Sequence, residues 1–527
     1  MNITHQKYLV MAVLLAANVS FIGLFLHFDQ YWYAFLAVLA LATTLNAFSA
    51  LLVLLSRMVF PSPAPRRRPK RNYIYVMPCY DESKDELAAS IQALARQRTM
   101  DGDTYMLVIL CDGVARTVET LKQILGIGAA REERYAYELP PPLSEMMGMS
   151  VFRGMYQADS GGSLLPFVLC AKDKNQGKRE SLVLVRRLCL RYNNNGTSWI
   201  FGRVFWGQKI DYIIGLDADT VLHDECAYHL IEGIERDSRI YGCVGYVDVA
   251  GGGGGRRFSP FNWYQYAEYM FAQCLKRQAQ SCITGKVSCL SGCNQILRVS
   301  EETCGEDLLK IFHRRPEAHE SIFTQIRGYA SEDRNHVGLM LSMYPYVRTT
   351  QALQATAYTQ VPQSVSVFLS QRRRWNLGAA ANDMLLVMLP NINFFERISA
   401  AVNVLTYAVN PFIFVATIWF FKALATHPTM LMLYLSIIML IPLTYIVLIP
   451  IFVRPLNFRE ALYFYGGMLL FLSAGTLVNL ATYFYSLSYM DEISWGKTRR
   501  LQIQQPQAPA QAPTININLM NARESYV

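Results

Sequence analysis

Two aspartates, Asp217 and Asp219, follow a run of apolar residues in the segment "DYIIGLDADT". That run predicts a β-strand, so the pair should lie at the strand's carboxyl end, where α/β sheets bind ligands. Carboxylate oxygens suit Mg²⁺ and Mn²⁺, and Mg²⁺ usually combines one or two carboxylates with substrate phosphate. The pair therefore predicts a site for Mg²⁺ or Mn²⁺ that holds the diphosphate of a nucleotide substrate.

Three further acidic clusters stand at or near predicted strand ends. "CYDES" contributes Tyr80 and Glu82, "LCDG" contributes Asp112, and "SEDRN" contributes Glu332 and Asp333. A single acidic residue at such a place usually caps a helix or belongs to a turn. Four clusters in one domain favour a reactive site, in which Asp333, separate from the metal ligands, is free to act as a general base.

An arginine cluster supplies the opposite charge. In "QRRRW", Arg372, Arg373 and Arg374 stand between Gln371 and Trp375, shortly before a long apolar run. Guanidinium groups bind phosphate oxygens in pairs, so the cluster could stabilise a departing pyrophosphate. It could equally anchor the chain at a membrane interface, with the arginine heads reaching toward water. The position in the sequence leaves both readings open.

Two glycine-containing segments do not fit phosphate-binding loops. "SCITGKVS" carries Gly285 and Lys286 but lacks the upstream glycine of a P-loop and the Ser or Thr directly after the lysine. "AGGGGGRR", at 250–257, has no strand-turn-helix context, and we predict a flexible hairpin tip there. A P-loop nucleotide hydrolase is therefore not supported.

The elements that must position the acidic residues alternate between strand and helix over residues 72–345. Short β-branched runs such as "YIYVMP" and "YMLVILCDG" are separated by helical patterns such as "ESLVLVRRLCLRY". This alternation predicts an α/β domain with a mostly parallel sheet. All 11 cysteines lie between Cys79 and Cys304 without a CxxC pair, which indicates reduced thiols in a cytosolic domain rather than a zinc site or disulfide framework.

Apolar blocks on both sides of this domain predict membrane helices. The chain has 52% hydrophobic and 17% charged residues, which fits a membrane-bound enzyme or a transporter better than a soluble enzyme. Each block is long enough to cross a bilayer, which takes about 20 residues. The predicted spans are 8–28 and 31–55, in an N-terminal hairpin at 1–60, and 398–424, 430–453 and 461–487, in a helical region at 397–490.

The connecting segments have their own composition. Residues 61–71 form a basic, Pro-rich linker, and residues 346–396 mix Arg, Trp, Phe and Met, which predicts interfacial helices. The net charge of +9 gathers beside the spans, so we expect a lipid bilayer and no nucleic acid as partner. Residues 501–527 predict a disordered tail, whose last three residues fit a PDZ-type pocket, a pattern that chance gives often.

The number of spans raises a topological conflict. Two N-terminal and three C-terminal spans would place the segment 491–500, which contains "SWGKTRR", on the far side of the membrane. Its basic residues predict the cytoplasmic side instead. The block at 461–487 carries Ser473, Gly475 and Thr476 near its middle. Our hypothesis is that this block breaks into a re-entrant or helical hairpin, which is allowed where protein shields the backbone.

In this order, "DAD", "EDR", "QRRRW" and "SWGKT" resemble the motifs of chitin synthases, which are processive family-2 glycosyltransferases with a GT-A-type catalytic domain. The resemblance runs from about Tyr73 to Arg500, and "KNQGKRES" at 174–181 resembles the family's basic segment before the Asp-x-Asp strand. "SWGKT" departs from the family's Ser-Trp-Gly-Thr because Lys497 and Thr498 stand in swapped order. The resemblance implies transfer of GlcNAc from UDP-GlcNAc to the 4-hydroxyl of a β-1,4 polymer, with inversion, release of UDP and export through a transmembrane channel. It also implies a plasma-membrane protein with a cytosolic catalytic domain.

The resemblance assigns a role to each matching residue. Asp333 would be the base, beside Glu332 and Arg334, and Asp219 would bind the metal more directly than Asp217. On the donor side it places residues that bind uracil, ribose or pyrophosphate, namely Tyr80, Glu82, Asp112, Lys178, Arg372 and Arg374. On the acceptor side it places Gln371, Arg373, Trp375, Cys289, Asn294 and Trp495. In "SCLSGCNQILR", Ser291 replaces the family's proline and Asn294 stands where an aromatic residue is usual.

Two other functions stay open at this point. A related processive synthase that makes hyaluronan or a β-glucan would share the acidic set and the arginine motif. A transporter or scaffold with a degenerate catalytic domain would keep the spans without the reaction. The sequence also leaves open the association of identical chains, the product length, the priming of the first sugar and the preferred metal.

Overall fold

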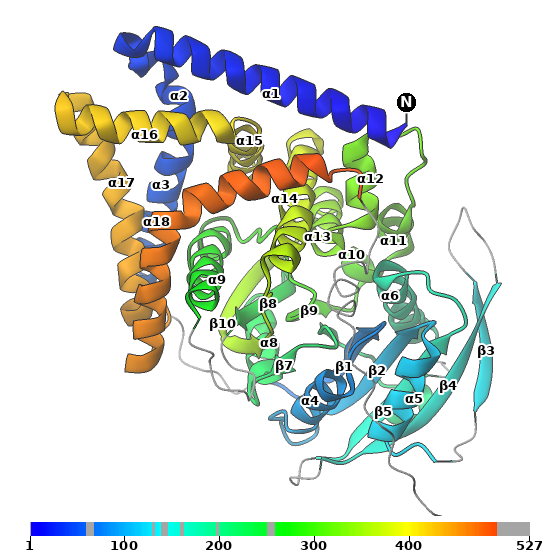
Figure 1. Ribbon diagram of the computed structural model, residues 1–527. Coiled ribbons are helices and arrows are strands. Elements are labelled where there is room, and N and C mark those ends of the chain that lie inside the picture. Colours follow the sequence, from blue (N-terminus) through cyan, green and yellow to red (C-terminus); the bar gives the residue numbers. More distant parts are fainter. Residues whose placement is uncertain are drawn as a thin grey trace, which may run out of the picture.

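The computed structural model describes residues 2–59, 68–128, 132–138, 146–158, 163–196, 200–249 and 259–492. A ten-stranded sheet with helices on both faces forms an α/β domain, and long apolar helices lie along one side of it (Figure 1). This arrangement confirms the predicted combination of an α/β domain with a helical region.

The sheet is mixed rather than mostly parallel. Its strand order is β3-β4-β5-β2-β1-β6-β9-β8-β10-β7. The strands β5, β2, β1 and β6 run parallel to one another, whereas β9 runs against both β6 and β8, and β4 runs against both β3 and β5. The strands are β1 (Asn72–Cys79), β2 (Thr104–Asp112), β3 (Glu133–Glu138), β4 (Met146–Tyr156), β5 (Leu165–Lys172), β6 (Tyr212–Gly215), β7 (Val221–Leu222), β8 (Ile240–Asp248), β9 (Gln295–Arg298) and β10 (Arg348–Tyr358).

Helices cover both faces of the parallel strands, which explains why β1 and β2 are almost continuously apolar. Side chains of α4, α5 and α8 pack on one face, and side chains of α6 and α7 pack on the other. The helices of the domain are α4 (Lys84–Ala95), α5 (Ala115–Ile124), α6 (Lys178–Asn195), α7 (Gly202–Phe205), α8 (Cys226–Glu235), α9 (Pro260–Phe271), η2 (Ala272–Arg277), η3 (Gln280–Thr284), α10 (Glu301–Cys304), α11 (Glu306–His313), α12 (Ile322–Tyr329) and α13 (Glu332–Met343).

The α/β domain extends past the predicted boundary at residue 345. β10 pairs with β8 and β7, so residues up to Tyr358 belong to the sheet. The arginine motif lies in the next helix, α14 (Val365–Met388), which packs against α12, α13, α15 and α18. The interfacial location predicted for 346–396 stays a prediction for α14 and does not apply to β10.

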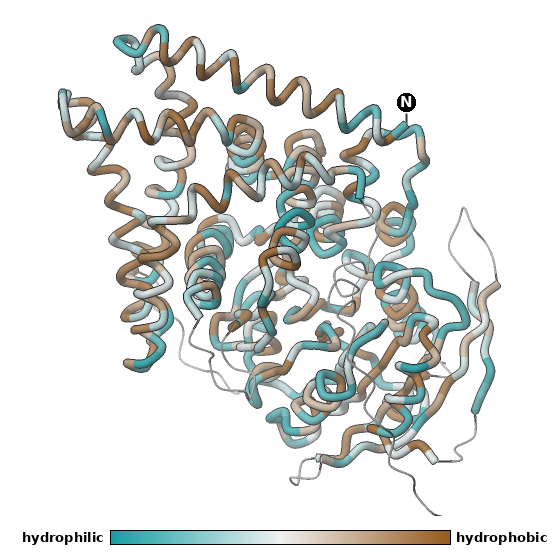
Figure 2. Tube along the Cα trace, viewed as in Figure 1, coloured by the Kyte–Doolittle hydropathy of each residue, from teal (hydrophilic) through white to brown (hydrophobic). Residues whose placement is uncertain are grey.

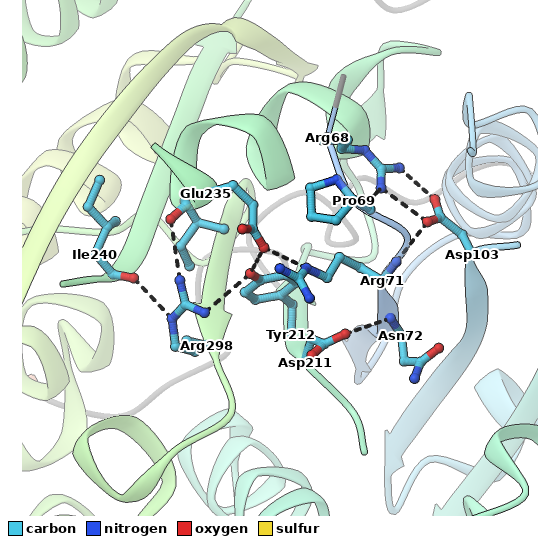
Figure 3. Close-up of polar contacts among 11 residues, drawn as sticks. Arg68, Pro69, Arg71, Asn72, Asp103, Asp211, Tyr212, Glu235, Ile240 and Arg298 are labelled. Atoms are coloured by element: carbon cyan, nitrogen blue, oxygen red, sulfur yellow. Dashed lines mark hydrogen bonds and ion pairs between the residues drawn. The ribbon is translucent and has the colours of Figure 1, made fainter. Parts of the chain in front are cut away.

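The predicted linker at 61–71 is fixed at its end. Figure 3 shows Arg68 and Arg71 at the amino end of β1. The Arg68 guanidinium donates to both carboxylate oxygens of Asp103, at 3.1 and 2.5 Å, and is nearly buried. Arg71 donates its Nε to Glu235 at 2.6 Å. Two of the basic residues that we predicted to lie beside the membrane therefore stabilise the sheet. Residues 60–67 lie outside the described residues.

The apolar helices are α1 (Ile3–His27), η1 (Asp29–Phe35), α2 (Leu36–Leu39), α3 (Leu41–Val59), α15 (Phe394–Ala408), α16 (Asn410–Thr426), α17 (Met430–Leu448), η4 (Ile449–Val453) and α18 (Phe458–Ser488). Within the described ranges, four are long and apolar enough to cross a membrane, namely α1, α3, α17 with η4, and α18. The pair α15 and α16 would be a fifth, although it bends by 81°. Figure 2 shows the apolar character of these helices.

The predicted break within 461–487 is wrong, because α18 is one continuous helix. The segments that flank α18 at both ends nevertheless contact the α/β domain or its cavity. Just before it, Arg454 pairs with Asp248 of β8 at 3.3 Å. Just after it, Met490 and Glu492 line a cavity beside the carboxyl ends of β1, β2 and β6. The side of the membrane on which each end of α18 lies stays a prediction, and a bend of 81° separates α15 from α16.

Candidate active site

A cavity of about 850 Å³ opens beside the carboxyl ends of β1, β2 and β6, where α/β sheets bind ligands. The volume suits a ligand of nucleotide-sugar size, since such pockets span roughly 300–1,000 Å³. The residues predicted from sequence that line it are Tyr80, Glu82, Asp112, Lys178, Asp217, Asp219, Cys289, Glu332, Asp333, Arg334, Gln371, Arg373, Arg374 and Trp375.

A lysine and three carboxylates, which we call the Lys178 cluster, line this cavity. The Nζ of Lys178, at the start of α6, lies 2.7 Å from Asp217 Oδ1 and 3.4 Å from Glu332 Oε1. Asp333 follows Glu332 in the first turn of α13 and completes the cluster. Burial opposes the charged form of Lys178, yet Asp217, Glu332 and Asp333 together raise its pKa well above the ordinary value.

Asp333 has the geometry of a proton acceptor. Its Oδ2 accepts a hydrogen bond from the backbone N–H of Gly292 at 2.7 Å. Its Oδ1 is buried and has no hydrogen-bond partner in the part of the chain that the structure describes. The pKa of Asp333 is raised to about 6, mainly by burial and also by Glu332 and Asp217, while Lys178 and the Gly292 N–H act against the rise. A carboxylate that titrates near neutral pH suits general-base chemistry.

Two glycines allow close packing around Asp333 and around Ser331, which precedes Glu332. A Cβ on Gly292 would lie 2.8 Å from Asp333 Oδ1, so a larger residue there would force the carboxylate to shift. On the other side, Ser331 adopts a left-handed backbone with a φ of 64° directly before Glu332. A Cβ on Gly378 of α14 would lie 2.5 Å from the Cβ of Ser331. Strained backbone of this kind costs about 1–3 kcal/mol and concentrates at functional sites.

Glu332 differs from its neighbour in sequence. Burial acts to raise its pKa, but Lys178 and Arg179 outweigh that effect and lower it. Glu332 therefore stays ionised at a pH where Asp333 gains a proton. Two adjacent carboxylates with pKa values pushed apart are the pattern expected when one of them handles the proton.

The two aspartates of "DAD" differ in their surroundings. Asp217 accepts from Lys178 and keeps 37% of its side chain exposed. Both Asp217 and Asp219 line the cavity. Among the described residues, no group of three or more His, Cys, Asp or Glu side chains could hold a metal ion. A cation at this pair would thus need further oxygens from a diphosphate, which is how Mg²⁺ is commonly held.

Asp112 belongs to a second, closed group of charges, which we call the Lys172 cluster. The Nζ of Lys172, at the end of β5, lies 2.7 Å from Asp112 Oδ1 and 2.5 Å from Glu180 Oε2. It also donates to Ser181 Oγ at 2.7 Å. The three charged side chains are at most 3% exposed. Asp112 borders the cavity, and its Oδ1 is engaged by Lys172, while its Oδ2 is buried without a hydrogen-bond partner among the described residues.

The three arginines of "QRRRW" point to three different places. Arg372 is 3% exposed and does not line the cavity. Its guanidinium donates to Glu268 at 3.2 and 2.5 Å and lies 4.2 Å from the ring centre of Trp375. The prediction that Arg372 binds the donor is therefore wrong. The helical period of α14 turns this side chain into the protein.

Arg373 and Arg374 do face the cavity. Arg373 donates to Glu492 at 2.8 Å and to the backbone oxygen of Tyr489 at 3.2 Å, both beyond the end of α18. Arg374 has a buried Nε without a partner among the described residues, and burial lowers its pKa. Of the three arginines, Arg374 is the best placed to meet a phosphate.

An aromatic pair forms one wall. Trp375 is 43% exposed and lines the cavity, with its ring centre 5.6 Å from that of Tyr269. Tyr269 was missed because its segment reads as an ordinary α9 helix. Asn294, in contrast, is fully buried, and its amide donates to the backbone oxygens of Tyr246 and Ala355. The predicted acceptor role of Asn294 is therefore wrong, since Asn294 joins neighbouring strands.

Arg179 is a second residue that sequence reasoning missed. Its guanidinium donates to the backbone oxygens of Phe312 and Arg327, at 2.7 and 2.5 Å, and to Asn335 Oδ1 at 3.1 Å. It thus ties the start of α6 to α13, which carries Asp333. Its place next to Lys178 in "KNQGKRES" was the available signal. Trp495, the rest of 493–527 and the glycine run at 250–257 lie outside the described residues.

Comparisons with known proteins identify the family of this site. The family model described as Chitin synthase matches residues 170–515. A relative named Chitin synthase 8, from Gibberella zeae, is 32% identical over 94% of this chain and 78% of the relative. The chain belongs to the chitin synthase family. A second Chitin synthase 8, from Verticillium dahliae, is 31% identical over 80% of this chain and 75% of the relative.

Other chitin synthase relatives match over a smaller share of their own length. Chitin synthase V of Fusarium oxysporum f. sp. lycopersici is 25% identical over 80% of this chain but only 24% of the relative. The solved structure of S. aureus TarS 1–349 covers 82% of this chain and 93% of that chain, with a TM-score of 0.31 and 9% identity, which is too low to support an argument. Because the chain belongs to the chitin synthase family and contains helices that could span a membrane, it is a membrane protein.

Proposed function

We propose that this chain is a chitin synthase that transfers GlcNAc from UDP-GlcNAc to the 4-hydroxyl of a growing β-1,4-linked GlcNAc chain. Family membership supports the sugar and the polymer. The observation that carries the reaction is Asp333, which lines a cavity at the sheet edge, has an Oδ1 without a hydrogen-bond partner among the described residues, and has its pKa raised to about 6. The transferase would lie in the plasma membrane, with the α/β domain in the cytosol, where nucleotide sugars are made.

In the proposed reaction, Asp333 Oδ1 accepts the proton of the acceptor's 4-hydroxyl. The oxygen forms a bond to the anomeric carbon of the donor, and the bond from that carbon to the UDP oxygen breaks. Attack opposite the leaving group inverts an α-linked donor to a β-linked product. Asp333 carries the proton and UDP carries the bonding electrons, so the step is balanced.

The departing diphosphate needs positive charge at the opposite side of the cavity. Arg374 supplies a guanidinium whose Nε has no partner among the described residues, and guanidinium groups match phosphate oxygens. Asp219, with Asp217 beside it, would hold Mg²⁺ or Mn²⁺ together with the diphosphate, and the cation would neutralise the charge that builds on UDP. Lys178 holds Asp217 in place and stands between the donor side and Asp333.

The aromatic wall would bind the acceptor. Sugars present apolar C–H faces to flat rings, and Trp375 with Tyr269 offers such a surface inside the cavity. Cys289, Gln371 and Arg373 lie on the same lining and would complete the acceptor side. The growing chain would then leave through the apolar helices, a path that stays part of this proposal.

The test is an assay of the full chain in sealed vesicles with UDP-GlcNAc as the sole sugar donor. We expect UDP release and an insoluble product that chitinase degrades. A requirement for UDP-glucuronate or UDP-glucose would show a hyaluronan or β-glucan synthase instead. An absence of turnover with all three donors would favour a transporter or scaffold with a degenerate catalytic domain.

A further inference from the structure

The first helix, α1, carries polar side chains that a simple membrane anchor does not need. Most of its surface is apolar, yet Lys7 and Asn18 are only 8% and 2% exposed. They stand about three turns apart and therefore on one face of the helix. Polar residues within membrane helices are costly and usually have specific partners. Each of these side chains contacts protein, as does Gln6 beside Lys7.

Lys7 connects α1 to the end of α18. Its Nζ donates to the backbone oxygen of Ser488 at 3.2 Å and forms an ion pair with Asp491 at 3.0 Å. The neighbouring residues Tyr489 and Glu492 accept hydrogen bonds from Arg373, which lines the cavity. A continuous chain of contacts thus runs from the start of α1 to the wall of the active site.

Gln6 connects α1 to α12 on the other side. Its Nε2 donates to the backbone oxygen of Glu320 at 2.9 Å, and its Oε1 accepts from the backbone N–H of Ile322 at 2.7 Å. The side chain thus satisfies an N–H in the first turn of α12, a group that would otherwise lack a partner. α12 leads through Tyr329, a cavity-lining residue, directly to Glu332 and Asp333.

Asn18 fixes the other end of the face. Its Nδ2 donates to the backbone oxygen of Ala408, and its Oδ1 accepts from the backbone N–H of Phe412, at 2.8 and 3.0 Å. These two groups lie on either side of the 81° bend between α15 and α16. α1 therefore spans from the bend to the cavity wall, as the long helix at the top of Figure 1.

We propose that α1 is a brace for the active site, with Gln6 and Lys7 as positioning residues that hold α12 and the end of α18 against the cavity. Neither residue touches the cavity, so both act through the segments that they hold. The expected kinetic effects rest on the proposed chitin synthase activity, whereas the brace itself rests on contacts between α1, α12 and the end of α18. The two can therefore be tested separately.

The kinetic test uses the full chain in vesicles, with Lys7→Met, Arg373→Gln and the double variant. Lys7→Met should lower kcat/KM for UDP-GlcNAc by about fivefold to twentyfold, and residues in one contact network should give non-additive effects. The loss from Lys7→Met should therefore shrink to less than twofold in the Arg373→Gln background. Fully multiplicative losses, or a Lys7→Met variant within twofold of the unchanged protein, would overturn the brace.

Two matched variants separate the brace from general damage to the helix. Val13 lies on the same helix, 58% exposed, and Val13→Ala should leave the kinetics unchanged. Lys7→Arg keeps the charge and should retain at least half of the rate. If Lys7→Met does not yield folded protein, Asp491→Asn removes the same ion pair from the other side and carries the same expectations.

A structural readout does not depend on turnover. Hydrogen–deuterium exchange of peptides that cover 483–492 should increase in Lys7→Met and stay unchanged in Val13→Ala. Unchanged exchange in Lys7→Met would overturn the brace even if the enzyme is active. A protein without UDP-GlcNAc turnover that still shows the increase would contradict the proposed function and support the brace.

Discussion

The Lys172 cluster and the Lys178 cluster contain the same kinds of groups and lie at the two ends of one short connection, between β5 and α6. Lys172 has two carboxylate partners, Asp112 and Glu180, and all three side chains are at most 3% exposed. Lys178 has contacts to Asp217 and Glu332, with side chains 37% and 15% exposed, and Asp333 lies beside them. The first cluster is closed and the second opens into the cavity.

The difference teaches which feature makes a cluster of charges reactive. In the Lys172 cluster a single ammonium pairs with two carboxylates that are at most 3% exposed, which stabilises the junction of β2, β5 and α6, although Asp112 borders the cavity. In the Lys178 cluster one ammonium group lies among three carboxylates at the surface of a cavity. Burial, together with the excess negative charge, raises the pKa of Asp333 to about 6, so this carboxyl can exchange a proton near neutral pH.

The largest expected effect comes from removing the proposed base, Asp333, in the open cluster. Asp333→Asn should lower polymer synthesis by about 10³-fold, since a positioned general base contributes typically 10²–10⁴-fold. UDP affinity should stay within a few-fold, because the substitution is nearly isosteric. Rates of UDP release and calorimetric UDP binding would measure the two quantities. Asp101→Asn, in an exposed turn, is the control. Retained synthesis in Asp333→Asn would reject Asp333 as the base.

Lys178→Met should reduce activity by about 10²-fold at pH 7, an effect of the size of one general-base interaction. Lys178 acts to lower the pKa of Asp333, so its loss raises that pKa and leaves less of the base ionised. Lys178→Arg, which keeps the charge, should recover part of the rate. Activity of Lys178→Met close to that of the unchanged protein would remove the distinction between the two clusters.

Lys172→Met should act on folding rather than on the reaction. It leaves Asp112 and Glu180 buried without their cation, and breaking a buried ion pair costs about 3–5 kcal/mol. We expect a lower apparent Tm and less folded protein, with the activity per folded molecule within about threefold. Lys122→Met, in the more exposed helix α5, is the control. A normal Tm combined with lost turnover would contradict the structural role of the Lys172 cluster.

The smallest effect is the pH dependence of the unchanged protein. Asp333 must be ionised to accept a proton, and its pKa is raised to about 6. The value of kcat/KM should therefore be level above pH 7 and fall about tenfold per pH unit below 6. Lys178→Met should shift this limb to higher pH, whereas Lys172→Met should leave it in place. A limb near pH 4 would show that an unperturbed carboxyl controls the rate.

Much of the candidate site could be predicted from short motifs. "DAD", "EDR" and the lysine of "KNQGKRES" are polar residues at strand or helix ends, and such ends meet at one edge of the sheet. The prediction failed where helical phase or strand packing decides. In α14, successive residues are rotated by about 100°, so Arg372 is buried against Glu268 while Arg374 faces the cavity. Asn294 looks like a loop residue but satisfies two backbone oxygens between strands.

The sequence by itself determined the chemical inventory: carboxylates at strand ends, arginines before a helical region, and apolar blocks long enough to cross a bilayer. These properties follow from residue type and local spacing, which set periodicity and charge. Only the tertiary structure decided which carboxylate has a raised pKa, which of the three arginines face the cavity, and that Lys7 meets Asp491 across nearly the whole chain. Desolvation and long-range contacts depend on residues far apart in sequence, and no local pattern records them.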